Sequence, residues 1–275
     1  DTLGAPDFIS ITPDSGQPEA AANRWHRLSS QKMSLSDINI REKEFHNNLH
    51  SSGEARNENK FYKALHNLYG DFLISLKNKA PNKNILDFGC GNGIYAEKVS
   101  NFNPLKITAI DISEKAIEIA KKKNNKINYT VENCENTKFD SGKFDIVYGV
   151  GILHHLNFDR AVNEIERLLK KKGSLVFIEP LGTNPLINLY RKLTPNSRSH
   201  DEHPLTFKDI KYFKGLFSEV EINYYGFLTL AFLPFYKSPK ESRFFNFLAK
   251  IDKIIFRVPF FKFLAWSVLI EARKN

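Results

Sequence analysis

The chain has 275 residues and a net charge of +9, and 41% of its residues are hydrophobic. This length and composition support one globular domain with a real core and argue against a disordered chain. Cys90 and Cys134 are the only cysteines, which argues against a disulfide framework. A cytoplasmic location, with its reducing environment, is therefore expected.

Residues 1–32 differ in composition from the rest of the chain and are predicted to be a disordered or added leader. They are rich in Ala, Pro, Ser and Asp, whereas the body is rich in Lys, Asn, Ile and Phe. Met33, the only methionine, stands at this change and is the expected natural start. The leader has neither the apolar stretch of a secretory signal nor the basic character of a transit peptide.

Residues 33–80 are predicted to form an N-terminal helical lid. Apolar residues recur at helical spacing over 58–79, so a helix should pack on a sheet just before its first strand. From residue 84 onward, segments with the pattern of a strand alternate with segments with the pattern of a helix. This alternation predicts a parallel sheet covered by helices on both faces. The expected strands are 84–88, 106–111, 127–131, 144–149, 173–179, 219–226 and 265–272, and the expected helices are 93–102, 113–124, 158–171 and 206–216.

The first strand leads directly into a glycine-rich turn. Residues 84–94 read NILDFGCGNGI, with Gly89, Gly91 and Gly93 after the strand-terminal Asp87. A dinucleotide fingerprint requires a last small residue for close helix packing, and Ile94 stands there instead. The pattern resembles motif I of class I S-adenosylmethionine (AdoMet) dependent methyltransferases.

This resemblance covers residues 84–180 closely and implies a fold and a cofactor, AdoMet. The implied fold is a Rossmann-like α/β domain at 81–275, whose seven-stranded sheet has the order 3-2-1-4-5-7-6 and helices on both faces. Asp87 would hold the amino-acid part of AdoMet and Asp111 the ribose hydroxyls, although Asp111 could instead cap the helix 113–124. The implied cofactor-binding set is Asp87, Gly89, Cys90, Gly91, Gly93, Asp111, Ile112, Asn133, Cys134, Glu135 and Gly149.

Candidate catalytic residues follow the fourth and fifth predicted strands, at the edge where open α/β sheets bind ligands. The stretch FDIVYGVGILHHL at 144–156 resembles motif IV of the family and brings His154 and His155 to this edge. A histidine suits removal of a hydroxyl proton near neutral pH, and Glu179 is a second candidate. Both histidines could instead have a structural role. No metal site is predicted, because the histidines lack paired cysteines.

Residues 228–263 are predicted to be a helical insertion between the last two strands. The stretch 224–266 holds 14 aromatic residues, and 237–262 holds seven bases against two acids. The helical face predicted to be apolar comprises Phe244, Phe247, Leu248, Ile251, Ile254 and Ile255. The insertion would cover an apolar substrate pocket or rest on an anionic membrane surface, or else pack as a plain helical hairpin. The lysine runs 121–123 and 170–172 are each expected to close a helix.

The predicted function is methyl transfer from AdoMet to a small acceptor of lipophilic or aromatic character, at oxygen. A nucleic-acid methyltransferase fits the basic charge, but the sequence Tyr148-Gly-Val-Gly replaces the Asn/Asp-Pro-Pro-aromatic motif used on bases, so no nucleic-acid partner is expected. Two competing hypotheses are a non-catalytic AdoMet-binding module that docks on a membrane or protein, and a hydride-transferring dehydrogenase. The oligomeric state is left open.

Overall fold

The computed structural model describes residues 36–51, 63–194, 199, 201–235 and 242–275. The predicted leader, Met33 and the first part of the helix expected over 58–79 lie outside the described residues. Asp37–Asn275 forms one compact unit.

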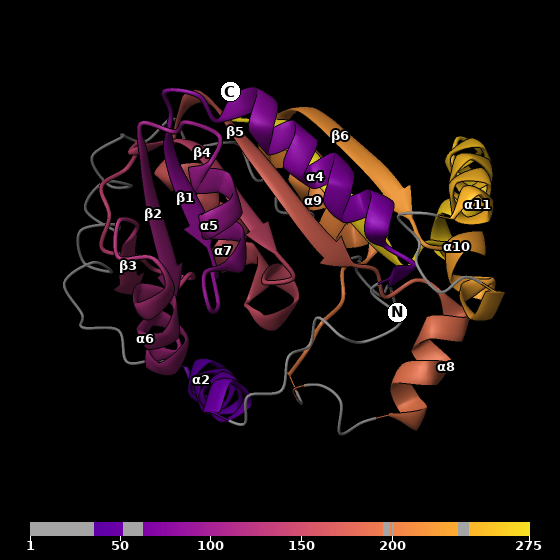
Figure 1. Cartoon of the computed structure of the whole chain (residues 1–275), viewed down its shortest axis with the longest axis horizontal. Coiled ribbons are helices and arrows are strands. Elements are labelled where there is room, and N and C mark those ends of the chain that lie inside the picture. The colour runs from indigo at the N-terminus through magenta and orange to yellow at the C-terminus, as the bar shows by residue number, and fades with distance from the viewer. Residues whose placement is uncertain (1–35, 52–62, 195–198, 200, 236–241) are drawn as a thin grey trace, which may run out of the picture. The chain divides into compact units, whose positions relative to one another are not determined.

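A seven-stranded sheet forms the centre of this unit (Figure 1). Its strands are β1 (Asn84–Phe88), β2 (Lys106–Asp111), β3 (Asn128–Val131), β4 (Phe144–Val150), β5 (Leu169–Pro180), β6 (Ser218–Tyr225) and β7 (Ser267–Arg273). The order is β3-β2-β1-β4-β5-β7-β6, and only the β5–β7 and β6–β7 pairs are antiparallel. The predicted fold and strand order are confirmed.

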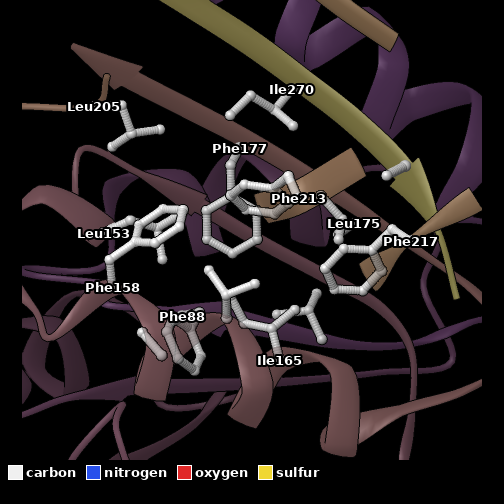
Figure 2. Packing of buried hydrophobic residues seen from close by; sticks show 14 of the residues in the cluster. Phe88, Leu153, Phe158, Ile165, Leu175, Phe177, Leu205, Phe213, Phe217 and Ile270 are labelled. Atoms are coloured by element: carbon white, nitrogen blue, oxygen red, sulfur yellow. The ribbon is translucent and has the colours of Figure 1, made fainter. Parts of the chain in front are cut away.

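Helices cover both faces of the sheet because neighbouring residues of its buried strands point to opposite sides. Ile85 packs with the face covered by α4 (His66–Lys79), α5 (Ile94–Ser100) and α6 (Glu114–Lys123). Leu86 packs with the opposite face, under α7 (Phe158–Leu168) and α9 (Phe207–Leu216). Figure 2 shows that second layer, where Phe88 and Phe177 of the sheet lie among side chains from α7 and α9. These two layers hold the carboxyl ends of the strands in place.

One predicted helix end was wrong. The helix expected over 158–171 ends at Leu168, and Lys170, Lys171 and Lys172 lie in β5 instead of closing a helix. Leu169 pairs with Phe144 of β4, and the amide of Lys172 donates to the carbonyl of Lys274 at 3.2 Å. Pairing with distant segments therefore outweighs the local helical pattern here.

The C-terminal insertion contains α10 (Leu228–Ala231), η4 (Leu233–Phe235), α11 (Arg243–Ile255) and η6 (Pro259–Leu264). Of the face predicted to be apolar, Leu248 is buried, whereas Phe244, Phe247 and Ile254 are exposed. The buried face of α11 instead consists of Phe245, Leu248, Ala249 and Asp252. The Asp252 carboxylate accepts hydrogen bonds from the Leu228 and Thr229 amides at 2.8 and 3.2 Å. The side of α11 that carries Asp252 therefore faces α10.

Two further helices flank the sheet edge. The helix α2 (Asp37–Ser51) packs against α6, and α8 (Pro185–Leu193) follows β5. In Figure 1, α8 lies at the same side of the fold as α10 and α11. No helix among the described residues combines the length and apolar character needed to cross a bilayer.

Candidate active site

The glycine turn connects β1 to α5 in a conformation that requires glycine. Gly89 and Gly93 have φ values of +79° and +80°, which side chains rarely tolerate. A Cβ added to Gly89 would lie 2.4 Å from Ile152, and one added to Gly93 would lie 2.6 Å from the Tyr129 hydroxyl. Gly91 also has a positive φ, of +50°. The turn is thus held tightly between its neighbours, with its backbone at the carboxyl edge of the sheet.

Asp111, at the end of β2, is hydrogen-bonded to this turn. Its Oδ2 accepts the Gly91 amide at 2.8 Å, and its Oδ1 accepts the Ser113 amide at 2.9 Å. The N-cap of α6 is Ser113, whose hydroxyl accepts the Ala116 amide at 3.0 Å. The expectation that Asp111 could serve as the helix cap was therefore wrong. Ile112, half-buried, continues the chain beside it.

Asp87 lies below the turn and is buried. The Tyr148 hydroxyl donates to its carboxylate at 2.8 Å. Burial raises the pKa of Asp87 to about 7, and the hydrogen bond from Tyr148 only partly offsets this effect. A cation bound near this carboxylate would stabilise its charged form. The thiols of Cys90 and Cys134 are also buried, which raises their pKa values and suits packing better than nucleophilic chemistry.

The loop after β3 is tied to α2. Glu135 is buried, and its Oε1 accepts the Asn39 side-chain amide and the Asn157 backbone amide, both at 2.9 Å. Asn133 donates to Asn39 at 3.2 Å and accepts the Glu135 amide at 2.9 Å. Glu135 therefore holds the loop after β3 against α2 and the start of α7. The side-chain oxygen of Asn133 already accepts one hydrogen bond, from the Glu135 amide.

Further polar contacts hold α2 at the carboxyl edge of the sheet. The Ser113 hydroxyl donates to Asn47 at 2.6 Å, and Lys43 pairs with Glu114. Arg41 forms a two-pronged pair with Asp201, at 2.7 and 3.0 Å. The helix α2 thereby links the ends of β2 and β3 to the segment after α8. Its role as a lid stays a prediction.

His154 and Glu179 meet at the ends of β4 and β5. His154 Nδ1 lies 2.8 Å from Glu179 Oε2, while Glu179 Oε1 accepts the Ile152 and Leu153 amides at 3.0 and 2.8 Å. Glu179 is fully buried, and burial raises its pKa to about 7. Its carboxylate fixes the loop η2 (Leu153–His155) and orients the ring of His154. Gly149 lies nearby, where a Cβ would approach Phe177 to 2.5 Å.

His155 points toward α2 and into a buried polar cluster. Its Nδ1 lies 3.0 Å from Glu42 Oε2 and 3.3 Å from the Ser199 hydroxyl. Burial, with the neighbouring His154, lowers the pKa of His155 to about 4. Burial alone would raise the pKa of Glu42, but His155, His46 and Ser199 hold it below its ordinary value. Sequence analysis missed Glu42 as a site residue, because no local motif marks it.

A hollow of about 610 Å³ lies elsewhere, along α4, β6, β7 and α11. Asp71, Lys79, Tyr224 and Glu271 are among its lining residues, and none of the predicted site residues is. No residue of the glycine turn lines this hollow, so it does not mark the candidate active site.

Comparisons with known proteins agree with this geometry. A family model described as "Methyltransferase domain" matches residues 86–177. The chain is 41% identical over 122 residues to the ubiquinone biosynthesis O-methyltransferase of Pelagibacter ubique, covering 42% of this chain and 49% of that protein. It is 29% identical over 159 residues to the protein of that name from Nitrosococcus oceani, covering 52% and 66%. The chain thus spans about half to two thirds of these relatives.

Two solved structures have a similar fold. Geranyl diphosphate C-methyltransferase from Streptomyces coelicolor aligns with a TM-score of 0.61 and 15% identity, covering 88% of this chain and all of that one. Phosphoethanolamine N-methyltransferase 2 from Haemonchus contortus aligns with a TM-score of 0.51 and 18% identity, covering 75% and 53%. At these identities the likeness concerns the fold alone.

Proposed function

We propose that this chain is a class I AdoMet-dependent methyltransferase and that it transfers the methyl group of AdoMet to an oxygen of a small acceptor. The observation that carries the proposal is the hydrogen bond that the Gly91 amide donates to the Asp111 carboxylate. It joins the glycine turn and a carboxylate suited to ribose hydroxyls at the sheet edge where ligands of such folds bind.

The described residues fit AdoMet. AdoMet supplies an electrophilic methyl group on a cationic sulfur, and it also carries an ammonium group. Asp87 is a buried carboxylate that lacks a cation among the described residues, so an ammonium group nearby would stabilise its charged form. Asp111 is only half-buried and would receive the ribose hydroxyls while it still holds Gly91. Both acids support an ammonium-bearing adenosyl ligand.

We assign the acceptor side of the site to His154. Glu179 holds His154 through Nδ1, and in our proposal the other ring nitrogen takes the proton from the acceptor. Glu179 is fully buried and has no access to an acceptor, so it is a positioning residue. His155 faces Glu42 and is likewise not assigned to proton transfer. The names of the relatives support an oxygen acceptor of aromatic, quinol-like character.

The test is calorimetric titration with AdoMet, S-adenosylhomocysteine and NADH, followed by methyl-transfer assays on phenols and quinols. We expect micromolar binding of the two adenosyl ligands, which corresponds to a binding free energy of about 8 kcal/mol. NADH should not bind. If neither adenosyl ligand binds, the proposal fails. If both bind and no acceptor is methylated, a non-catalytic AdoMet-binding module becomes the better account.

His154→Gln tests the proton acceptor. We expect the turnover number to fall about 100-fold, because a positioned base contributes roughly that factor or more, while AdoMet affinity stays unchanged. His66→Gln is the matched control, since His66 is exposed on α4. Full activity in His154→Gln would show that another group, or water, removes the proton.

We further propose that the C-terminal insertion contacts an anionic membrane surface and so brings the enzyme to a lipophilic acceptor. Phe235, Phe247 and Phe260 are 73%, 59% and 71% exposed, which is unusual for such large apolar side chains. On α11, Lys250 shares the exposed face of Phe247, which suits an anionic interface. Nearby, Leu186, Leu189 and Leu193 of α8 are also exposed.

Vesicle sedimentation tests this contact. We expect binding to phosphatidylglycerol vesicles, weaker binding to phosphatidylcholine, and a loss of about tenfold in Phe235→Ser/Phe260→Ser, since each change removes exposed apolar area from the interface. Equal binding of the variant and the wild type would exclude the insertion as the contact. Leu105→Ser, on a different part of the fold, is the control because Leu105 is 68% exposed.

A further inference from the structure

The helix α2 and the loop η2 bring three potential metal ligands together. Glu42 and His46 are four residues apart on α2, so both project from one face of that helix. His155 approaches them from η2. The three ligand atoms lie within 4.8 Å of one another. Sequence analysis predicted no metal site, because it looked for ligands that are close in the chain.

The distances suit a small divalent ion. Glu42 Oε2 lies 3.0 Å from His155 Nδ1 and 3.6 Å from His46 Nε2. Tetrahedral bonds of 2.0–2.1 Å to zinc place neighbouring ligand atoms about 3.3 Å apart. The two distances to Glu42 are therefore within a few tenths of an ångström of the zinc geometry, and the two imidazole nitrogens, which lie within 4.8 Å of each other, would draw together around the ion.

Glu42 is the second observation that points to a ligand. Its side chain is buried, and the nitrogens nearest to its carboxylate are His155 Nδ1 and His46 Nε2, neither of which forms a hydrogen bond of good angle with it among the described residues. A buried carboxylate in such surroundings is costly unless a cation or strong donors face it. The carboxylate is directed at the two imidazoles, at distances that an ion would bridge.

A further carboxylate lies beside the cluster. Glu202 Oε1 lies 3.9 Å from His155 Nε2. That distance is too long for a hydrogen bond, so Glu202 contributes a nearby negative charge that favours a bound cation. His46 is 21% exposed at its side chain, so an ion has a route from solvent.

We propose that Glu42, His46 and His155 bind one divalent transition ion of the zinc class, which fastens α2 to the loop carrying His154. Two imidazoles and a carboxylate form a common three-ligand zinc set that leaves a fourth position for water. The site does not depend on the proposed methyl transfer. Its occupation would order the lid whether or not AdoMet is bound.

The test uses the full chain after removal of metal by a chelator. Titration with Zn²⁺ should show one ion per chain at micromolar affinity or tighter, and Glu42→Gln and His46→Gln should bind at least tenfold more weakly. Glu202→Gln should weaken binding less than either of these changes, because it removes a nearby negative charge and no ligand. Glu44→Gln is the matched control, because Glu44 lies on the exposed face of the same helix.

A second measurement does not depend on how well the variants fold. In the wild-type chain, Zn²⁺ should slow amide exchange of residues 37–51 at least tenfold, and Co²⁺ in its place should give visible absorption typical of four-coordinate nitrogen and oxygen ligands. Equal Zn²⁺ affinity in the wild type and His46→Gln, or unchanged exchange in α2, would overturn the proposal. In that event the cluster is a hydrogen-bonded contact between α2 and η2.

Discussion

The carboxyl edge of the sheet and the C-terminal insertion depart from the usual distribution of side chains in opposite ways. At the edge, the carboxylates of Asp87 and Glu179 are no more than 2% exposed. In the insertion, Phe247 and Phe260 are 59% and 71% exposed. Folding alone explains neither, because buried charge and exposed aromatic area both cost stability. Such positions are expected where a protein meets ligands or surfaces.

The two regions also differ in how they are held. Backbone amides and the Tyr148 hydroxyl satisfy the buried acids of the edge, so that part is rigid around its polar groups. The insertion depends on a small apolar contact around Phe245 and on Asp252, which accepts amides of α10. Perturbing the insertion should therefore affect stability through a few residues, whereas perturbing the edge should affect ligand binding and pH response.

The largest expected effect separates the two faces of α11. Phe245→Ala should lower the free energy of unfolding by about 3–5 kcal/mol, because it empties a fully buried position. Phe247→Ala should change it by less than about 0.5 kcal/mol, since that ring is exposed. Urea denaturation measures both. A comparable loss in the two variants would mean that the buried face of α11 is assigned incorrectly.

The next effect concerns pH and the buried acid of the edge. The folded-state pKa of Asp87, about 7, lies above the unfolded value near 3.9, so protonation favours the folded state. The wild type should therefore lose stability as pH rises from about 4 to about 7, by up to about 4 kcal/mol relative to Asp87→Asn. Thermal unfolding across this range measures the difference. A wild type that gains stability over the variant as pH rises would contradict the expected sign.

A smaller effect concerns the cofactor. Asp111→Ala should weaken AdoMet binding about 100-fold, near 3 kcal/mol, because it removes the carboxylate that holds Gly91 and would bind the ribose. The fold should persist, as judged by circular dichroism. Asp159→Ala, at an exposed position, should bind normally. Unchanged affinity in Asp111→Ala would remove the basis of the cofactor assignment.

Sequence patterns predicted the edge far better than the insertion. At the edge, each role depends on a residue's distance from a strand end, and glycines at fixed intervals specify the turn. The helix α11 is apolar over much of its circumference, so periodicity alone does not tell which side of the helix is buried. The buried side is the one that carries Asp252, which accepts amides of α10. Such a contact is not encoded in the period of one helix.

Two other features needed three-dimensional information. The lysines at 170–172 look like a helix end, yet they belong to β5 because that stretch pairs with β4 and approaches Lys274. The cluster of Glu42 and His155 joins segments far apart in the chain. Spacing rules cannot anticipate either one, because each depends on the way the complete sheet positions its neighbours.

The attachment of α2 has a kinetic consequence. The contacts of Arg41 and Asn47 are polar and at least partly exposed, so each contributes little and can break separately, and the buried bond from Asn39 to Glu135 is a single contact. The helix can then leave and return without disturbing the apolar layers beneath the sheet. We expect escape of the spent cofactor to require this departure, so that turnover follows the opening rate and rises with ionic strength as the Arg41–Asp201 pair weakens.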